Sequence, residues 1–266
     1  GRCMRHHRQW IGISGAFVLF AAGPAAAECV AKSGTQRVAL LELYTSEGCS
    51  SCPPADRWLA DLGPAGLAPT RVAPLALHVD YWNYIGWTDP FSQARFTERQ
   101  QAYSVRGGTR AVYTPQFILD GREYRGWFRG ENFARRIENA SAQPASAAIA
   151  LRLTRVDQAT LEVTGEVSVT ETTARERIGV YVALYENNLV NDVRAGENRG
   201  QRLRHDYVVR RLEGPFALSA DGRLTLRQRF ALAPDWKRPD LGITTFVQNR
   251  ANGEILQTVT LSPCLK

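Results

Sequence analysis

The feature that most constrains this chain is a cysteine pair placed between an apolar run and two prolines. The run Leu-Leu-Glu-Leu-Tyr over 40–44 predicts a buried strand, and a Ser-Glu-Gly turn follows it. Cys49 and Cys52 come next in C-x-x-C spacing, and Pro53-Pro54 opens a helix, because proline is tolerated in a first helical turn. Cys49 is therefore expected at a helix N-terminus, where free amides and the positive dipole end favour a thiolate. Cys52, one turn further on, is placed to resolve a mixed disulfide, so the spacing predicts a redox-active pair.

Two other interpretations of this pair stay open. The first is half of a structural zinc site, which needs a second pair of cysteine or histidine ligands at matching spacing. Outside the N-terminal leader, the chain offers only His78, His205, Cys29 and Cys264, and no two of them are close in sequence. The second is a purely structural disulfide.

The first 27 residues predict an export signal. A basic segment over 4–9 precedes an apolar stretch over 10–22, and Ala25-Ala26-Ala27 fits a cleavage site. The apolar stretch is shorter than a membrane span needs, and no second long apolar run exists, so no stable membrane span is expected. The sequence predicts a signal peptide over 1–27 and a periplasmic or secreted location.

The remaining cysteines predict a second bridge. Four cysteines follow the leader, an even number that suits an oxidising compartment. If Cys49 and Cys52 form one pair, Cys29 and Cys264 are left to join the two ends of the chain. The formal charge of +7 includes three arginines of the leader, and no basic run is interleaved with aromatic residues. A nucleic-acid partner is therefore not expected.

The hydrophobic pattern divides the chain into two parts. In residues 28–144 the apolar residues follow strand patterns in some segments and the helical period in others. Residues 145–266 show short strands of alternating polarity with no helical period. The sequence predicts strands over 38–44, 72–79 and 111–119, helices over 53–62, 91–103 and 130–140, and a hairpin turn at Asp120-Gly121. The predicted fold is an α/β domain over 28–144 followed by a separate β-sandwich-like domain over 145–266.

The first part resembles the thioredoxin fold. A strand, a C-x-x-C at a helix start, a parallel strand and then Thr114-Pro115 before a hairpin follow the order of that superfamily. The resemblance implies that Cys49 attacks, Cys52 resolves, and Thr114 with a cis Pro115 faces the substrate. The sequence departs from the thioredoxin pattern six residues before the first cysteine. Thioredoxins have a buried acid at that position, whereas this chain has Leu43.

A narrower resemblance covers nearly the whole chain after the leader. The stretch Leu-Tyr-Thr-Ser-Glu-Gly-Cys-Ser-Ser-Cys-Pro-Pro-Ala-Asp, together with His78-Val-Asp-Tyr-Trp, is similar to a family of secreted bacterial thioredoxin-like proteins of unknown function. That family carries a β-rich C-terminal extension. The resemblance therefore implies the α/β thioredoxin-like domain and the β-rich extension together.

Several residues near the cysteines are possible accessory groups. His78 and Asp80, two apart at a strand end, are expected to face the same side in a metal or proton-transfer role, or simply to be hydrogen-bonded there. Trp82 belongs to an aromatic cluster that either walls a peptide groove or forms core. Glu47 either opposes a Cys49 thiolate or is an exposed turn carboxylate. The charged segment 187–206 is interpreted as a solvated loop, with a binding role, such as packing over the first part of the chain, as the alternative.

Two functions follow from these features. The first is an exported thiol–disulfide oxidoreductase without a bound cofactor, acting on protein or peptide thiols through Cys49 and Cys52. The alternative is a non-catalytic thioredoxin-like binding module for a partner protein or for copper, with Cys49, Cys52 and His78 as soft ligands.

Overall fold

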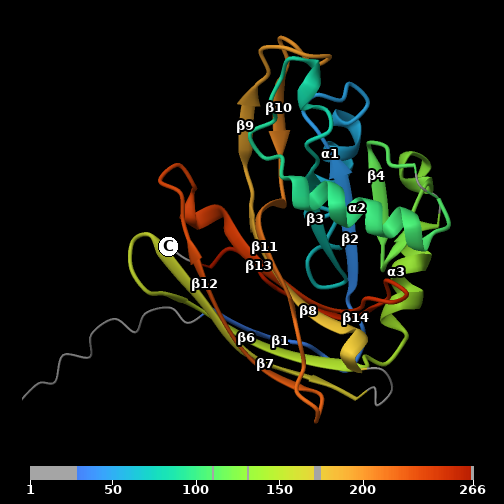
Figure 1. Ribbon diagram of the computed structural model, residues 1–266, viewed down its shortest axis with the longest axis vertical. Coiled ribbons are helices and arrows are strands. Elements are labelled where there is room, and N and C mark those ends of the chain that lie inside the picture. The colour runs from blue at the N-terminus through green and yellow to red at the C-terminus, as the bar shows by residue number, and fades with distance from the viewer. Residues whose placement is uncertain (1–28, 110, 131, 171–174, 265–266) are drawn as a thin grey trace, which may run out of the picture.

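The computed structural model describes residues 29–109, 111–130, 132–170 and 175–264 (Figure 1). Its largest element is an eight-stranded sheet to which both parts of the chain contribute. In spatial order the strands are β14 (Ile255–Leu261), β13 (Leu241–Asn249), β8 (Ile178–Glu186), β11 (Val208–Phe216), β3 (Val72–His78), β2 (Ala39–Thr45), β4 (Gln116–Leu119) and β5 (Arg122–Glu123). β2 and β3 are parallel and β11 runs parallel to β3, whereas the other neighbours are antiparallel.

Helices cover both faces of the β2–β3–β4 region. Helices α1 (Pro53–Ala60) and α3 (Phe133–Ser141) pack on one face, and α2 (Ala94–Arg106) packs on the other. Because successive strand residues point to opposite faces, Leu41 and Leu43 pack toward α1 while Leu40 packs toward α2. Every residue of β2 and β3 is buried, as their continuous apolar sequences require.

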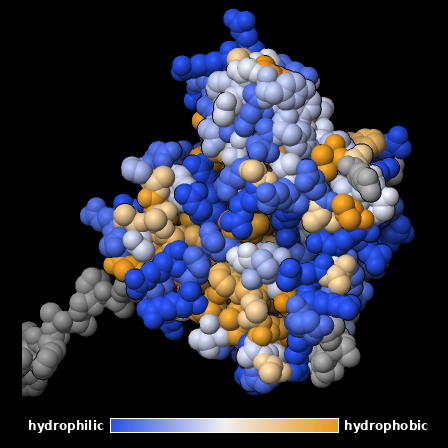
Figure 2. Space-filling view, in the orientation of Figure 1, coloured by the Kyte–Doolittle hydropathy of each residue, from blue (hydrophilic) through white to orange (hydrophobic). Residues whose placement is uncertain are grey.

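The other end of the large sheet forms a sandwich. A four-stranded sheet of β1 (Cys29–Lys32), β6 (Ala147–Arg155), β7 (Thr160–Val169) and β12 (Arg223–Ala231) shares one hydrophobic core with β8, β13 and β14. In β6 the inward residues Ile149, Leu151 and Leu153 are buried, and they alternate with less buried ones. Figure 2 shows hydrophilic residues over most of this face of the molecule, with apolar residues gathered mainly in the lower half of the view.

A two-stranded hairpin stands apart from both sheets. Strands β9 (Leu189–Asp192) and β10 (Arg202–His205) pair antiparallel and project beside α1, at the top of Figure 1. The charges of this segment favour a solvated loop, and that interpretation is wrong for Leu203, Asn198 and His205. These residues are buried against the N-terminal part of the chain, which agrees with the alternative of packing over that part.

The predicted fold class is corrected by this topology. The described chain is mostly β, with three sheets and only three α-helices, and it is not an α/β thioredoxin-like domain followed by a separate sandwich. Val208 of β11 pairs with Ala76 of β3, and β1 joins the four-stranded sheet instead of the first part. The physical reason is that β3 is apolar on both faces, which predicts burial but does not say which strand fills its open edge. The expected division at 144/145 lies between α3 and β6 and stays a prediction.

The two ends of the described chain are joined by a disulfide. Cys29 begins β1 and Cys264 follows β14, and their Cα atoms are 6.0 Å apart. The predicted pairing is confirmed, and the bridge ties the edges of the two sandwich sheets together. No helix in the described ranges is long and apolar enough to cross a membrane. The predicted signal peptide lies outside the described residues.

Candidate functional site

The second disulfide, between Cys49 and Cys52, lies where β2 leads into α1. Cys52 is the N-cap residue of α1 and the prolines occupy its first turn, as the sequence predicted. The two Cα atoms are 5.4 Å apart. Cys49 is 1% exposed and Cys52 is 0% exposed, whereas Ser50 and Ser51 between them are exposed.

Thr114 and Pro115 lie against this disulfide. The Thr114 carbonyl oxygen is 3.7 Å from Cys49 Sγ, and the Thr114–Pro115 peptide is cis. The Ser51 hydroxyl is 3.3 Å from the same sulfur atom. The Trp82 indole donates a hydrogen bond of 2.7 Å to the Thr114 hydroxyl, which fixes the loop after β3 to this turn. The structure therefore brings together five of the residues selected from the sequence.

The tip of the β9–β10 hairpin holds the cysteine loop in place. The buried Asn198 amide donates hydrogen bonds to two carbonyls, that of Glu47 at 2.8 Å and that of Cys49 at 2.9 Å. The Glu197 carboxylate accepts a hydrogen bond of 2.9 Å from the Ser50 amide, which lowers the pKa of Glu197. Neither residue was selected from the sequence, because nothing local shows that they reach a loop about 150 positions earlier.

Glu47 is buried, so its interpretation as an exposed turn carboxylate was wrong. One carboxylate oxygen, Oε2, accepts hydrogen bonds of 2.9 Å from the Trp87 indole and from the Asn191 amide. The other oxygen, Oε1, lies 3.1 Å from His205 Nε2. The segment that carries Glu47 is thus fixed from two sides, by the loop after β3 and by the hairpin.

His78 pairs with Asp89 and not with Asp80. Its Nδ1 lies 2.7 Å from Asp89 Oδ2, and both side chains are fully buried. Burial opposes a charge on His78, but the Asp89 carboxylate outweighs it and raises the pKa of His78. Burial likewise opposes the charge on Asp89, but His78 and two backbone amides lower its pKa. Asp80 instead accepts a hydrogen bond of 2.6 Å from the Thr97 hydroxyl.

His205 links this pair to α1. Its ring packs edge-on against the His78 ring with centroids 5.0 Å apart. Its Nδ1 lies 3.7 Å from Asp56 Oδ2, one turn after Cys52. Burial is the main cause that raises the pKa of Asp56. Five ionisable groups therefore lie together behind the cysteine loop: Glu47, Asp56, His78, Asp89 and His205.

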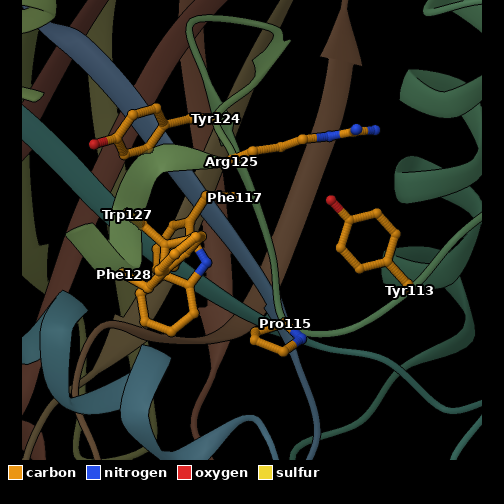
Figure 3. Close-up of a pocket in the computed structure, with 7 residues that line it drawn as sticks. All are labelled: Tyr113, Pro115, Phe117, Tyr124, Arg125, Trp127 and Phe128. Atoms are coloured by element: carbon orange, nitrogen blue, oxygen red, sulfur yellow. The ribbon is translucent and has the colours of Figure 1, made fainter. Parts of the chain in front are cut away.

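An aromatic hollow opens beside Pro115. It has a volume of about 380 Å³ and is lined by Tyr113, Pro115, Phe117, Tyr124, Arg125, Trp127 and Phe128. Figure 3 shows the rings of Phe117, Trp127 and Phe128 on one side, Tyr113 on the other and Pro115 below. The 3₁₀-helix η2 (Gly126–Arg129) carries Trp127 and Phe128, and Phe128 is 62% exposed. This hollow is lined from β4 and η2 and not by Trp82, which packs against the hydrophobic core on the α2 face of the sheet.

The structure gives no support to the copper alternative. Across the described residues, no three His, Cys, Asp or Glu side chains are arranged to hold a metal ion. Cys49 and Cys52 are joined to each other, and His78 is paired with Asp89.

The sequence of residues 40–248 matches a family model described as a protein of unknown function, DUF1223. The chain belongs to the DUF1223 family. A comparison with curated proteins finds no match.

Two solved structures are similar to this family member. Protein AGR_C_4864 from Agrobacterium tumefaciens is 26% identical, with a TM-score of 0.59 over 88% of this chain and 98% of that one. HBP35 of Porphyromonas gingivalis is 20% identical, with a TM-score of 0.66 over 86% of this chain and 76% of that one, which is a likeness of fold alone.

Replacing Asn198 by alanine is expected to loosen the cysteine loop. The change leaves the carbonyls of Glu47 and Cys49 without the amide that satisfies them, which costs about 1–3 kcal/mol of unfolding free energy. After reduction, Cys49 should also be alkylated faster in Asn198→Ala than in the parent protein, and mass spectrometry measures that rate. Asn252→Ala, at an exposed turn, is the matched control. Equal alkylation rates in both variants would show that the hairpin does not restrain the loop.

Proposed function

We propose that this protein is an exported thiol–disulfide oxidoreductase that acts on protein or peptide thiols through Cys49 and Cys52. The observation that carries the proposal is the placement of the disulfide at the first turn of α1, with Cys49 Sγ beside the Thr114 carbonyl. Free amides and the dipole of a helix N-terminus stabilise the thiolate that forms when such a bond opens.

The proposed exchange has two steps. A substrate thiolate attacks Cys49 Sγ, a mixed disulfide forms, and Cys52 leaves with the bonding electron pair. A second substrate thiolate then attacks the substrate sulfur of the mixed disulfide and releases Cys49. Two electrons thereby move from two substrate thiols to the Cys49–Cys52 bond, and the substrate leaves as a disulfide. The reverse sequence reduces a substrate disulfide.

The surroundings of the cysteines support a polypeptide substrate. The aromatic hollow beside Pro115 suits an apolar side chain next to the reacting cysteine, because aromatic walls give large contact area at low entropic cost. The proposed likeness to thioredoxins is limited to this neighbourhood: the cysteine pair at a helix start, the parallel strands β2 and β3, and the cis Thr114–Pro115 turn. It does not extend to the overall fold.

The two disulfides are consistent with an extracellular or periplasmic location, because such bonds persist in oxidising compartments. We propose that the protein is exported by the signal peptide expected over 1–27.

A second candidate is a non-catalytic module that binds a partner protein. The observation that favours it is the burial of the cysteines at 1% and 0% exposure, since a reactive disulfide has to be reached by its substrate. In that case the Cys49–Cys52 bond is structural, and the aromatic hollow is the binding surface.

The reduction potential of the Cys49–Cys52 pair distinguishes the two candidates. Equilibration of the mature protein with glutathione, with mass spectrometry as readout, is expected to give a value near or above roughly −230 mV. In Cys52→Ser the mixed disulfide at Cys49 should accumulate, because the resolving thiol is missing, whereas a Cys49→Ser/Cys52→Ser control should trap nothing. A potential below about −300 mV with no trapped adduct would overturn the proposed oxidoreductase function and favour the non-catalytic binding module.

A further inference from the structure

Five ionisable side chains are buried together behind the cysteine loop, and the exchange reaction described above uses none of them. Glu47, Asp56, His78, Asp89 and His205 are each between 0% and 5% exposed. Burying charged groups costs free energy, so a cluster of buried ionisable side chains marks a candidate functional site. Their presence beside a disulfide calls for a role in that chemistry.

Three of these groups lie in a row, with His205 between Glu47 and Asp56. His205 Nε2 is 3.1 Å from Glu47 Oε1, and His205 Nδ1 is 3.7 Å from Asp56 Oδ2. The His205 Nδ1 and Asp56 Oδ1 atoms are buried and have no hydrogen-bond partner. An imidazole can accept a proton on one nitrogen and release one from the other, so His205 is able to pass protons along this row.

The two outer residues of this row are close to the cysteines in the sequence. Glu47 precedes Cys49 by two residues, and Asp56 follows Cys52 by four. Side chains four residues apart on a helix lie on the same face, so Asp56 shares the Cys52 face of α1. Cys52 is 0% exposed, and a thiolate formed there is shielded from water. Its proton therefore has to come from within the protein.

Solvent reaches the Asp56 side of this row through a hollow. A cavity of about 410 Å³ between α1 and β10 is lined by both Asp56 and His205. The charged residues around this cavity are Arg57, Asp61, Arg202, Arg204 and Asp206. The groups that face His205 inside the protein are Glu47, Asp56 and His78. His78 is in turn hydrogen-bonded to Asp89.

We propose that Asp56 and His205 act as a proton store for Cys52. They donate a proton to the Cys52 thiolate, and they take up a proton from solvent through the α1–β10 hollow. The proposal rests on the proposed thiol–disulfide exchange. When the Cys49–Cys52 bond breaks and Cys52 leaves as a thiolate, the Asp56 carboxyl gives it a proton. His205 returns a proton to Asp56 and takes one from solvent, into which the substrate thiols have released theirs. In the reverse direction Cys52 loses its proton along the same route before it attacks.

Burial supports this assignment because it raises the pKa of Asp56, and a carboxyl group that holds its proton to higher pH can act as a donor.

The first test needs no variant. Asp56 and His205 are titrated by NMR in the oxidised protein and in the protein reduced with dithiothreitol. Reduction turns the Cys52 sulfur from a disulfide atom without a proton into a thiol that can donate a hydrogen bond to the Asp56 carboxylate, so the pKa of Asp56 is expected to be lower in the reduced form than in the oxidised form. Identical titrations in both forms would overturn the proposal, whether or not the protein exchanges with glutathione.

The second test measures two rates as a function of pH. The first is the rate at which glutathione attacks the disulfide and releases Cys52, and the second is the rate of the resolution step, in which Cys52 attacks the glutathione mixed disulfide at Cys49. In Asp56→Asn and His205→Gln the resolution step is expected to slow by about 10-fold or more, and its pH profile should flatten. Asp61→Asn, an exposed carboxylate at the same hollow, is the control and should keep the parent rate and profile. Parent rates and profiles in both folded variants would overturn the proton store and leave the oxidoreductase standing. Failure of the unsubstituted protein to react with glutathione would count against the oxidoreductase, and the NMR titration would still decide on the store.

Discussion

Replacing Cys29 and Cys264 together by serine is expected to lower the free energy of unfolding by about 5 kcal/mol. The two cysteines are separated by 235 positions, so their bond closes almost the whole described chain into one loop. In the chain-entropy account the stabilisation grows with loop length, because a longer loop removes more freedom from the unfolded chain. Cys29 is also buried in the sandwich core at the first position of edge strand β1, and β6 is the one strand to which this short strand is hydrogen-bonded.

Urea unfolding of the mature protein measures this effect. The matched control is Cys49→Ser/Cys52→Ser, which removes a bond with a sequence separation of only 3. The same account gives that bond about 2 kcal/mol. If the two double variants lose equal stability, the terminal bond does not act by restricting the unfolded chain.

Much of the local structure can be predicted from the sequence because local patterns determine it. The strands predicted over 38–44 and 72–79 are β2 and β3, and the hairpin predicted at Asp120-Gly121 joins β4 to β5 with positive φ at both residues. The helix expected over 91–103 is found at Ala94–Arg106, since Gln93 is still extended. The positions of Cys49 and Cys52 at the start of α1 follow from the prolines alone.

The arrangement of the two parts could not be predicted in this way. A continuous apolar strand such as β3 announces burial on both faces, but its partner β11 lies more than 130 positions later and pairs with it at a single register position. The alternation in β8 and β13 fits a sandwich equally well whether their sheet ends there or continues into β3 and β2. The fold-class prediction was wrong because it did not foresee that the sheet of β13 and β8 continues through β11 into β3 and β2.

The candidate site shows the same limit. Cys49, Cys52, Thr114 and Pro115 were found because a spacing and a resemblance point to them. His205 sits in a segment whose many arginines and carboxylates indicate a solvated loop, and only the fold places its ring against His78 and Glu47. A buried histidine in a charged stretch leaves no periodic signal.

Replacing Arg99 by alanine is expected to destabilise the protein by about 3–5 kcal/mol, because it leaves a buried carboxylate without its cation. Arg99 on α2 bonds Glu42 of β2 through two nitrogens, at 2.6 Å and 3.2 Å, and Glu42 is 1% exposed. The same guanidinium lies about 5 Å from the ring centres of Tyr181 and Phe246, which belong to the C-terminal part of the large sheet. Arg99 therefore joins strands from both parts of the chain across one helix.

Two further variants separate the charge from the packing. Arg223→Ala removes an exposed arginine whose pairing with Asp221 is open to water, and it should change the unfolding free energy by less than about 0.5 kcal/mol. Arg99→Met/Glu42→Leu removes both charges while keeping apolar volume, and it should recover a large part of the loss seen in Arg99→Ala, since the penalty comes from the unpaired carboxylate. Urea unfolding of the three variants measures these differences. A double variant as unstable as Arg99→Ala would mean that the charge pair is not the main contribution. The ring contacts, the hydrogen bond to Gln248 and the hydrogen bonds that Glu42 accepts from the Tyr44 and Tyr103 hydroxyls would then account for the loss.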